Sequence, residues 1–105
     1  MEIKKVLSEI KSVLHKIEPD AKTILYGSQA RGDAREDSDI DLLILLPDAY
    51  TGKVFAQKCG MISNALYDLS EKHNVEISPL ILLYKTFYAR KTLFTINIAN
   101  EGIAL

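Results

Sequence analysis

Apolar positions follow helical spacing in some stretches of the chain and strand spacing in others. Between residues 3 and 17 they recur at steps of three and four, which is typical of an amphipathic helix that Pro19 then ends. Apolar runs at 23–26 and 40–46 predict two buried strands, of which the first leads into Gly27. The chain between these strands is polar, so we expect a loop there that contains one helical turn.

The second half of the chain repeats this order. A three-and-four spacing predicts a long helix over about 50–72, in which Gly60 costs about 1 kcal/mol relative to alanine. Residues 75–83 predict a third strand, and residues from about 86 to 100 a last helix before a short tail. This succession predicts an α/β fold, a small mixed sheet flanked by helices, and we expect one domain over residues 1–105.

Composition and charge narrow the class of protein. Of the 105 residues, 48% are apolar and 26% charged, which is the balance of a globular chain rather than a disordered one. The net charge of −1 gives no indication of a protein whose main role is to bind nucleic acid. No apolar run approaches the ~20 residues of a membrane-spanning helix, so we expect no membrane role. Because Cys59 is the single cysteine and no signal segment begins the chain, we expect a cytoplasmic protein.

Two aspartates at the start of the second strand carry the strongest chemical signal. Side chains alternate faces along a strand, so Asp39 and Asp41 point the same way, about 6.5–7 Å apart, while Ile40 points into the core. Two carboxylates this close repel each other and lose hydration where the strand enters the core. A divalent cation such as Mg²⁺ removes both costs, so we interpret the pair as metal ligands rather than as a polar strand end.

Gly27 and Ser28 complement the aspartates. Glycine after a buried strand lets the backbone approach a ligand closely. Ser28 can cap the turn that follows and leave backbone N–H groups available to an anion, so the pair predicts a phosphate site rather than a plain turn.

Two further residues have both a functional and a structural interpretation. Glu76 interrupts the apolar third strand, and its carboxylate could complete a metal site and accept a proton; the alternative is an exposed glutamate on an edge strand. Arg31 could contact a phosphate, but pairing with Asp33, Asp37 or Asp39 to shape the loop is the interpretation we favour.

The spacing of these motifs is similar to that of a known superfamily. Ten residues separate Gly27-Ser28 from Asp39-Ile40-Asp41, which resembles the Gly-Ser and Asp-x-Asp motif of the DNA polymerase beta-like nucleotidyltransferases. The full run 27–32 and the ending 97–102 look like the minimal nucleotidyltransferases of bacteria and archaea. The family's third acidic residue is often aspartate, whereas the matching position here is Glu76.

This resemblance implies an activity and assigns roles. It implies transfer of a nucleoside monophosphate, AMP from ATP, to an acceptor hydroxyl with two Mg²⁺ ions and release of pyrophosphate. Gly27, Ser28 and Arg31 would bind the nucleotide, Asp39 and Asp41 both metals, and Glu76 the catalytic metal as ligand and base. It also implies a helical HEPN-type protein partner. The alternative is a non-catalytic, antitoxin-like or regulatory binding module that pairs with such a partner.

Overall fold

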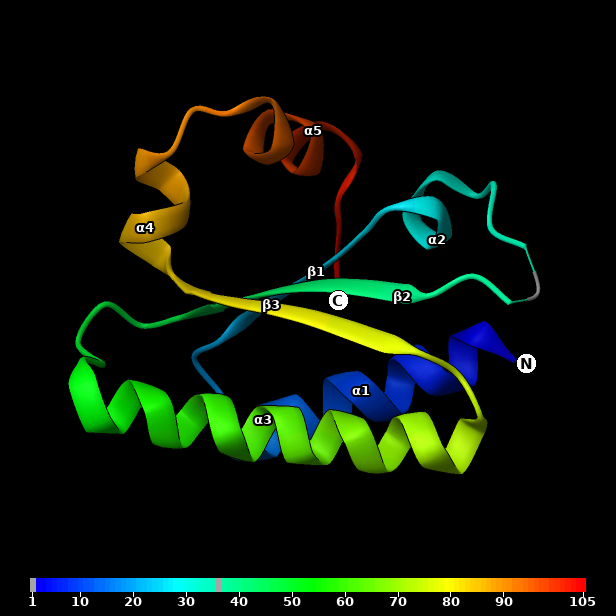
Figure 1. Cartoon of the computed structure of the whole chain (residues 1–105), viewed down its shortest axis with the longest axis horizontal. Coiled ribbons are helices and arrows are strands. Elements are labelled where there is room, and N and C mark those ends of the chain that lie inside the picture. The colour runs from blue at the N-terminus through cyan, green and yellow to red at the C-terminus, as the bar shows by residue number, and fades with distance from the viewer. Residues whose placement is uncertain (1, 36) are drawn as a thin grey trace.

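The helices and strands follow one another in an order that places a small sheet between helices. The computed structural model describes residues 2–35 and 37–105. In chain order the elements are α1 (Ile3–Ile17), β1 (Lys22–Tyr26), α2 (Ser28–Arg31), β2 (Ile40–Leu46), α3 (Gly52–His73), β3 (Ile77–Leu83), α4 (Tyr84–Ala89), α5 (Leu93–Glu101) and β4 (Ile103–Ala104) (Figure 1). None of the helices in these ranges is both long and apolar enough to cross a membrane.

The strands form one mixed sheet in the order β3-β2-β1-β4. β1 runs antiparallel to both β2 and β4, whereas β2 and β3 are parallel. Parallel neighbours need a long crossover connection, and α3 supplies it here. The register places Asp41 of β2 between Tyr26 of β1 and Ser78 of β3, so the strand with the aspartate lies inside the sheet.

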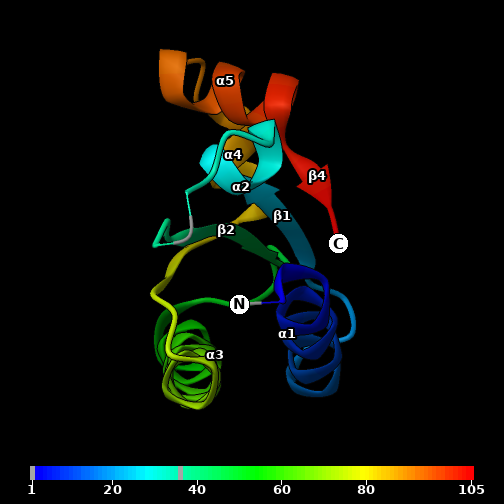
Figure 2. The ribbon, with the colours of Figure 1, turned by 90° about the vertical axis from the view of Figure 1, so that its right-hand side faces the viewer.

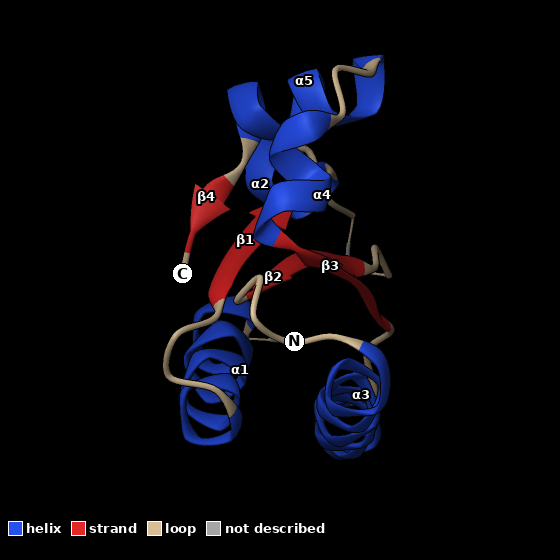
Figure 3. Ribbon diagram, turned by 90° about the vertical axis from the view of Figure 1, so that its left-hand side faces the viewer, coloured by secondary structure: helices blue, strands red, loops and turns tan. Residues whose placement is uncertain are grey.

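Helices cover both faces of the sheet. α1 and α3 lie side by side against one face, and α2, α4 and α5 lie over the other, as both end views show (Figures 2 and 3). Alternate residues of β2 therefore enter two separate apolar clusters: Ile40 and Leu42 pack toward α1 and α3, whereas Leu43 and Leu45 pack with Phe87 and other residues of the α4–α5 side. This burial on both faces explains why β2 is almost entirely apolar apart from its aspartate.

The predicted mixed sheet flanked by helices is confirmed, and the first helix has the predicted bounds. The single last helix predicted over about 86–100 is wrong. The chain forms α4 and α5 instead, and α5 begins at a capping box in which the Thr92 side chain accepts the Thr95 N–H at 3.2 Å. The predicted C-terminal tail is also wrong in part, because Ile103 and Ala104 pair with β1 as an edge strand.

Candidate functional site

The two predicted metal ligands lie at the N-terminal end of β2. Asp41 is in the strand and half-buried, and Asp39 directly precedes the strand and is exposed. Asp41 shares its sheet face with Leu43, which is the face toward α4 and α5, while Ile40 points into the opposite core. The core residues on both sides of Asp41 therefore fix the direction of its carboxylate.

The environment of Asp41 disfavours its negative charge. Burial is the main cause that raises the pKa of this carboxyl above its ordinary value, and the nearby charge of Asp39 raises it further. The Arg31 guanidinium acts in the opposite direction and lowers it. A carboxylate that is desolvated and repelled by a second carboxylate is stabilised by a cation placed between them.

Gly27 brings the backbone directly against Asp41. Its φ of 75° lies in the region that favours glycine, and an added Cβ would stand 2.4 Å from Oδ2 of Asp41. The Gly27 carbonyl accepts the N–H groups of Ala30 and Arg31 at 3.1 and 3.0 Å, which closes the turn of α2. The turn of the predicted phosphate site and the predicted metal ligand are thus in contact.

The start of α2 leaves donors available beside this contact. Among the hydrogen bonds of the described residues, none uses the backbone N–H of Ser28 or Gln29. Unpaired N–H groups at the start of a helical turn carry partial positive charge and suit an anion. The turn therefore combines donors for a phosphate with a nearby carboxylate for a cation.

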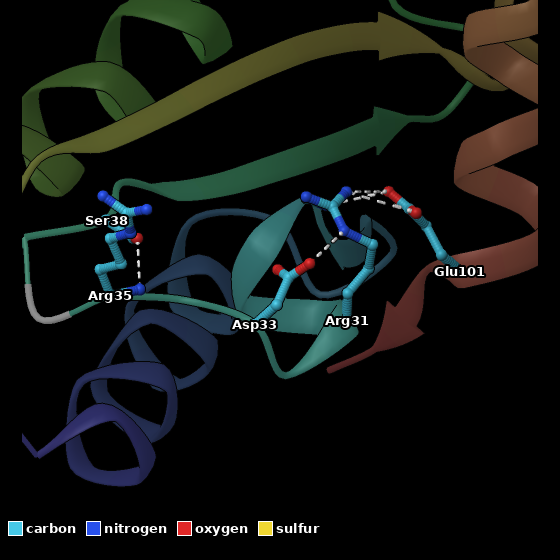
Figure 4. Close-up of polar contacts among 6 residues, drawn as sticks. Arg31, Asp33, Arg35, Ser38 and Glu101 are labelled. Atoms are coloured by element: carbon cyan, nitrogen blue, oxygen red, sulfur yellow. Dashed lines mark hydrogen bonds and ion pairs between the residues drawn. The ribbon is translucent and has the colours of Figure 1, made fainter.

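Arg31 is held by two carboxylates, as Figure 4 shows. Its Nε lies 3.2 Å from Oδ2 of Asp33, and its Nη1 lies 3.3 Å from Oε1 of Glu101. The pairing with Asp33 is one of those expected from the sequence. The pairing with Glu101 is not, because 70 residues separate the two and no local pattern connects them.

The loop between α2 and β2 is shaped by its own polar groups. Ser38 Oγ accepts the Arg35 N–H at 2.7 Å (Figure 4), and Gln29 Nε2 donates to the Ser38 carbonyl at 3.4 Å. These bonds hold Ser38, and with it the direction in which the chain enters Asp39. Glu36 in this loop lies outside the described residues.

The backbone of Glu76 lies beside the start of β2. It directly precedes β3, and its carbonyl accepts the Ile40 N–H at 2.9 Å. The side chain is exposed, and the residue borders a hollow of about 430 Å³ that Ser63 and Tyr67 of α3 also line. Within residues 2–35 and 37–105, no group of three His, Cys, Asp or Glu side chains is close enough to hold a metal ion. The structure thus brings Gly27, Asp39 and Asp41 together, while the carboxylates of Asp39, Asp41 and Glu76 do not form one metal-binding group.

The site is bordered by a pair of aromatic residues, and the sequence does not reveal this pair. Tyr26 is the cross-strand neighbour of Asp41, and Phe94 of α5 packs edge-on against its ring with centroids 5.8 Å apart. Burial, and then the charge of Asp41, raise the pKa of the Tyr26 phenol. Half of the Phe94 side chain remains exposed, so α5 presents apolar surface next to the carboxylates.

The chain is similar to known proteins over almost its full length. Residues 4–105 match the family model described as a nucleotidyltransferase domain. A protein of Methanocaldococcus jannaschii, named as a candidate protein adenylyltransferase, is 39% identical over 105 residues that cover 98% of each chain.

Two solved structures share the fold. A crystal structure of a toxin–antitoxin with AMP-PNP matches 92% of this chain and 69% of its own, with a TM-score of 0.61 and 16% identity. A candidate nucleotidyltransferase from Sulfolobus solfataricus matches 97% of this chain and 83% of its own, with a TM-score of 0.57 and 17% identity. At these identities the likeness concerns the fold.

Proposed function

The chain belongs to the nucleotidyltransferase domain family, and from this premise we propose that it transfers AMP from ATP to a hydroxyl group. The observation that carries the proposal is the contact between the Gly27 turn and the Asp41 carboxylate, with Asp39 beside it. In the proposed reaction the acceptor oxygen bonds to the α-phosphorus as the bond to the bridging oxygen breaks. Pyrophosphate leaves, and the hydroxyl proton passes to a base, for which Glu76 is the candidate.

We propose that Asp39 and Asp41 hold two Mg²⁺ ions, with Glu76 as the third ligand of one of them. The residues fit these ions, because Asp41 is partly desolvated and repelled by Asp39, and hard oxygen ligands suit Mg²⁺. Bound Mg²⁺ supplies charge neutralisation for the triphosphate and for the pair of aspartates. The exposed Glu76 side chain begins next to these ligands, since its backbone is hydrogen-bonded to Ile40.

Gly27, Ser28 and Arg31 are the proposed nucleotide-binding residues. The N–H groups at the start of α2 suit the β- and γ-phosphates. Arg31 brings a positive charge to the same turn, although Asp33 and Glu101 already neutralise much of it. We therefore assign the main phosphate contacts to the backbone and a supporting role to Arg31.

For the acceptor we propose a hydroxyl on a protein partner of the helical HEPN type. The M. jannaschii relative is named for protein adenylylation, and one structural neighbour is a toxin–antitoxin. The exposed apolar side chains of α4 and α5 offer a surface of suitable character beside the site, namely Tyr88, Leu93, Phe94 and Ile96. This surface lies close to Asp41, because Phe94 packs against Tyr26 and Tyr26 is the cross-strand neighbour of Asp41.

A second function is favoured by one observation. The carboxylates of Asp39, Asp41 and Glu76 do not form one metal-binding group, which suits a non-catalytic, antitoxin-like or regulatory module that pairs with a partner without modifying it. Pyrophosphate release in the presence of the partner and Mg²⁺ separates the two functions, because only the enzyme releases it.

The metal requirement tests the enzymatic proposal first. Asp39 and Asp41 alone repel phosphates, so triphosphate binding should depend on a divalent cation. Calorimetric titration with a non-hydrolysable ATP analogue should show binding in millimolar Mg²⁺. In chelator the affinity should be weaker by roughly tenfold or more, because the charge pairing between the cation and the phosphates is lost. Equal affinity in both solutions would contradict the proposal.

Asp41→Asn is the matched variant for this titration. Asparagine keeps the size of the side chain against Gly27 but removes the charge. The variant should stay folded in chelator, because the substitution relieves repulsion by Asp39, and it should lose most of the Mg²⁺-dependent binding. A variant that still binds in Mg²⁺ as tightly as the original chain would place the metal elsewhere.

A further inference from the structure

We propose that Glu101 is a positioning residue of the nucleotide site, which holds the Gly27 turn and the Arg31 guanidinium in place for the triphosphate. Its Oε1 accepts the Gly27 N–H at 3.2 Å. The same Oε1 accepts the Arg31 Nη1–H at 3.3 Å, and Oε2 lies 3.5 Å from that Nη1 (Figure 4). One carboxylate from the end of the chain therefore connects both ends of α2. The proposal rests on the proposed function.

The packing of the C-terminal segment fixes the position of the Glu101 carboxylate. Glu101 ends α5, and the Gly102 N–H bonds to the Ile98 carbonyl at 2.7 Å. A Cβ on Gly102 would stand 2.5 Å from that carbonyl oxygen and 2.6 Å from Cγ2 of Ile24 in β1. The chain passes this narrow point and pairs at once with β1, through Leu25 and Ile103. The position of Glu101 relative to Gly27 is thus set on both sides.

The contacts explain how Glu101 affects the site without lying among the proposed metal ligands. Its effect on the phosphate turn is direct, since the bond to Gly27 fixes the residue that contacts Asp41. Its hold on Arg31 is also direct, because Oε1 of Glu101 lies 3.3 Å from Nη1 of Arg31. Removal of Glu101 should loosen the turn and free Arg31 at the same time.

Two substitutions separate these effects. Glu101→Gln keeps an oxygen that can accept the Gly27 N–H but removes the charge that holds Arg31. Glu101→Leu removes both. The control is Asp33→Asn, which takes away the other partner of Arg31 and leaves the Gly27 bond intact. Thermal melts establish that each variant is folded.

The experiment has two measurements on the whole chain. Hydrogen exchange by NMR should show the Gly27 amide exchanging at least about tenfold faster in Glu101→Leu, with little change in Glu101→Gln or Asp33→Asn. Titration with AMP-PNP and Mg²⁺ should give a dissociation constant raised about tenfold or more in Glu101→Leu and a few-fold in Glu101→Gln. Asp33→Asn, which also removes one charged partner of Arg31 and keeps the Gly27 bond, should weaken binding no more than Glu101→Gln does.

The outcomes distinguish this proposal from the proposed function. If the original chain binds no triphosphate, the proposed function is wrong and the positioning role falls with it. If the original chain and Glu101→Leu bind equally well, or if the Gly27 amide exchanges at the same rate in both, only the positioning role is wrong. Tighter binding by Glu101→Leu would also overturn it, because Glu101 would then compete with the phosphates.

Discussion

Gly27 lies so close to the Asp41 carboxylate that position 27 can carry no side chain. The 2.4 Å separation between Oδ2 of Asp41 and a Cβ built on Gly27 leaves no room for a methyl group. The φ of 75° adds a conformational cost for any other residue. Steric fit and backbone conformation therefore point to the same requirement at this position.

Gly27→Ala tests this requirement. The methyl group must displace either the turn or the Asp41 carboxylate, so the variant should be destabilised by about 1–3 kcal/mol and should bind triphosphate much more weakly. Chemical denaturation and calorimetry measure the two effects. Gly60→Ala is the matched control, because Gly60 lies in α3 with nothing within 4 Å of its added Cβ.

The control has an expected sign of its own. Alanine is the better helix former, so Gly60→Ala should stabilise the chain by about 0.5–1 kcal/mol and leave binding unchanged. A Gly27→Ala variant that behaves like this control would show that the turn can move away from Asp41 without loss.

The residues predicted from the sequence are those whose relations are local. Asp41 lies in one strand with Asp39 directly before it, and Gly27-Ser28 directly follows another strand, so alternation and turn chemistry are enough to place them. Glu101 and Phe94 escape this reasoning, because their partners Arg31 and Tyr26 lie about 70 residues away in the chain. Such pairs depend on how α5 packs, which no local pattern encodes.

The helices and strands also divide into those that a local sequence pattern predicts and those that it does not. α1 and α3 have strong periodic patterns and β2 a continuous apolar run, and all three are found within a few residues of their predicted bounds. The last helix is not, because the break between α4 and α5 consists of Arg90, Lys91 and Thr92 and contains no glycine or proline to mark it. Thr92 begins α5 by accepting the Thr95 N–H, and a capping box built from two threonines is a weaker sequence signal than one with glutamate. β4, with two residues, is too short for alternation to reveal.

Polar contacts connect α1 and α3 beneath the sheet. Glu18, which is 4% exposed, accepts the Tyr50 hydroxyl, and Lys58 Nζ lies 3.5 Å from the same carboxylate. Lys58 also donates to the Ile17 carbonyl at 2.9 Å, so it caps the end of α1. A buried carboxylate is stable here because donors surround it.

The pKa of Glu18 gives a pH-dependent prediction. The hydrogen bond from Tyr50 is the main cause that lowers this pKa below its ordinary value of 4.5, against the effect of burial. A carboxyl with a lowered pKa adds stability above about pH 4.5 and loses it as the pH falls through the folded-state value. Tyr50→Phe should therefore lower the melting temperature by a few degrees at pH 7, and this difference should shrink below pH 4.5.

Thermal melts from pH 3 to 7 provide the measurement. Tyr67→Phe is the control, since Tyr67 lies on α3 and is 63% exposed. It should leave both the melting temperature and its pH dependence nearly unchanged. An equal loss of stability by Tyr50→Phe at every pH would mean that packing of the ring, not its hydroxyl, holds α1 against α3.

The candidate site is assembled from segments that lie far apart in the sequence. β1 brings Gly27, β2 brings the aspartates, the crossover through α3 sets Glu76 beside β2, and α5 returns to place Glu101. The order of the strands is what makes these meetings possible, because β2 lies between the other two that contribute.

Glu76 is the residue whose role depends most on this assembly. If it acts as base and ligand of the catalytic metal, Glu76→Gln should abolish transfer and spare most nucleotide affinity. On that proposal the ion that accompanies the triphosphate would need only phosphate oxygens and the two aspartates, whereas activation of the acceptor would need the third carboxylate. Single-turnover transfer to the partner should fall by roughly 10²–10⁴-fold, the usual effect of removing a general base, while the dissociation constant for ATP changes only a few-fold.

Glu71→Gln is the control for this last measurement, because Glu71 borders the same hollow from α3 and loses the same charge. It should transfer AMP at the original rate. A fall in both variants would indicate that the negative charge of the hollow, not the chemistry of Glu76, supports the reaction. Transfer by Glu76→Gln at the original rate would mean that the base lies elsewhere. The exposed glutamate before β3 would then have only its backbone bond to Ile40 as a structural role.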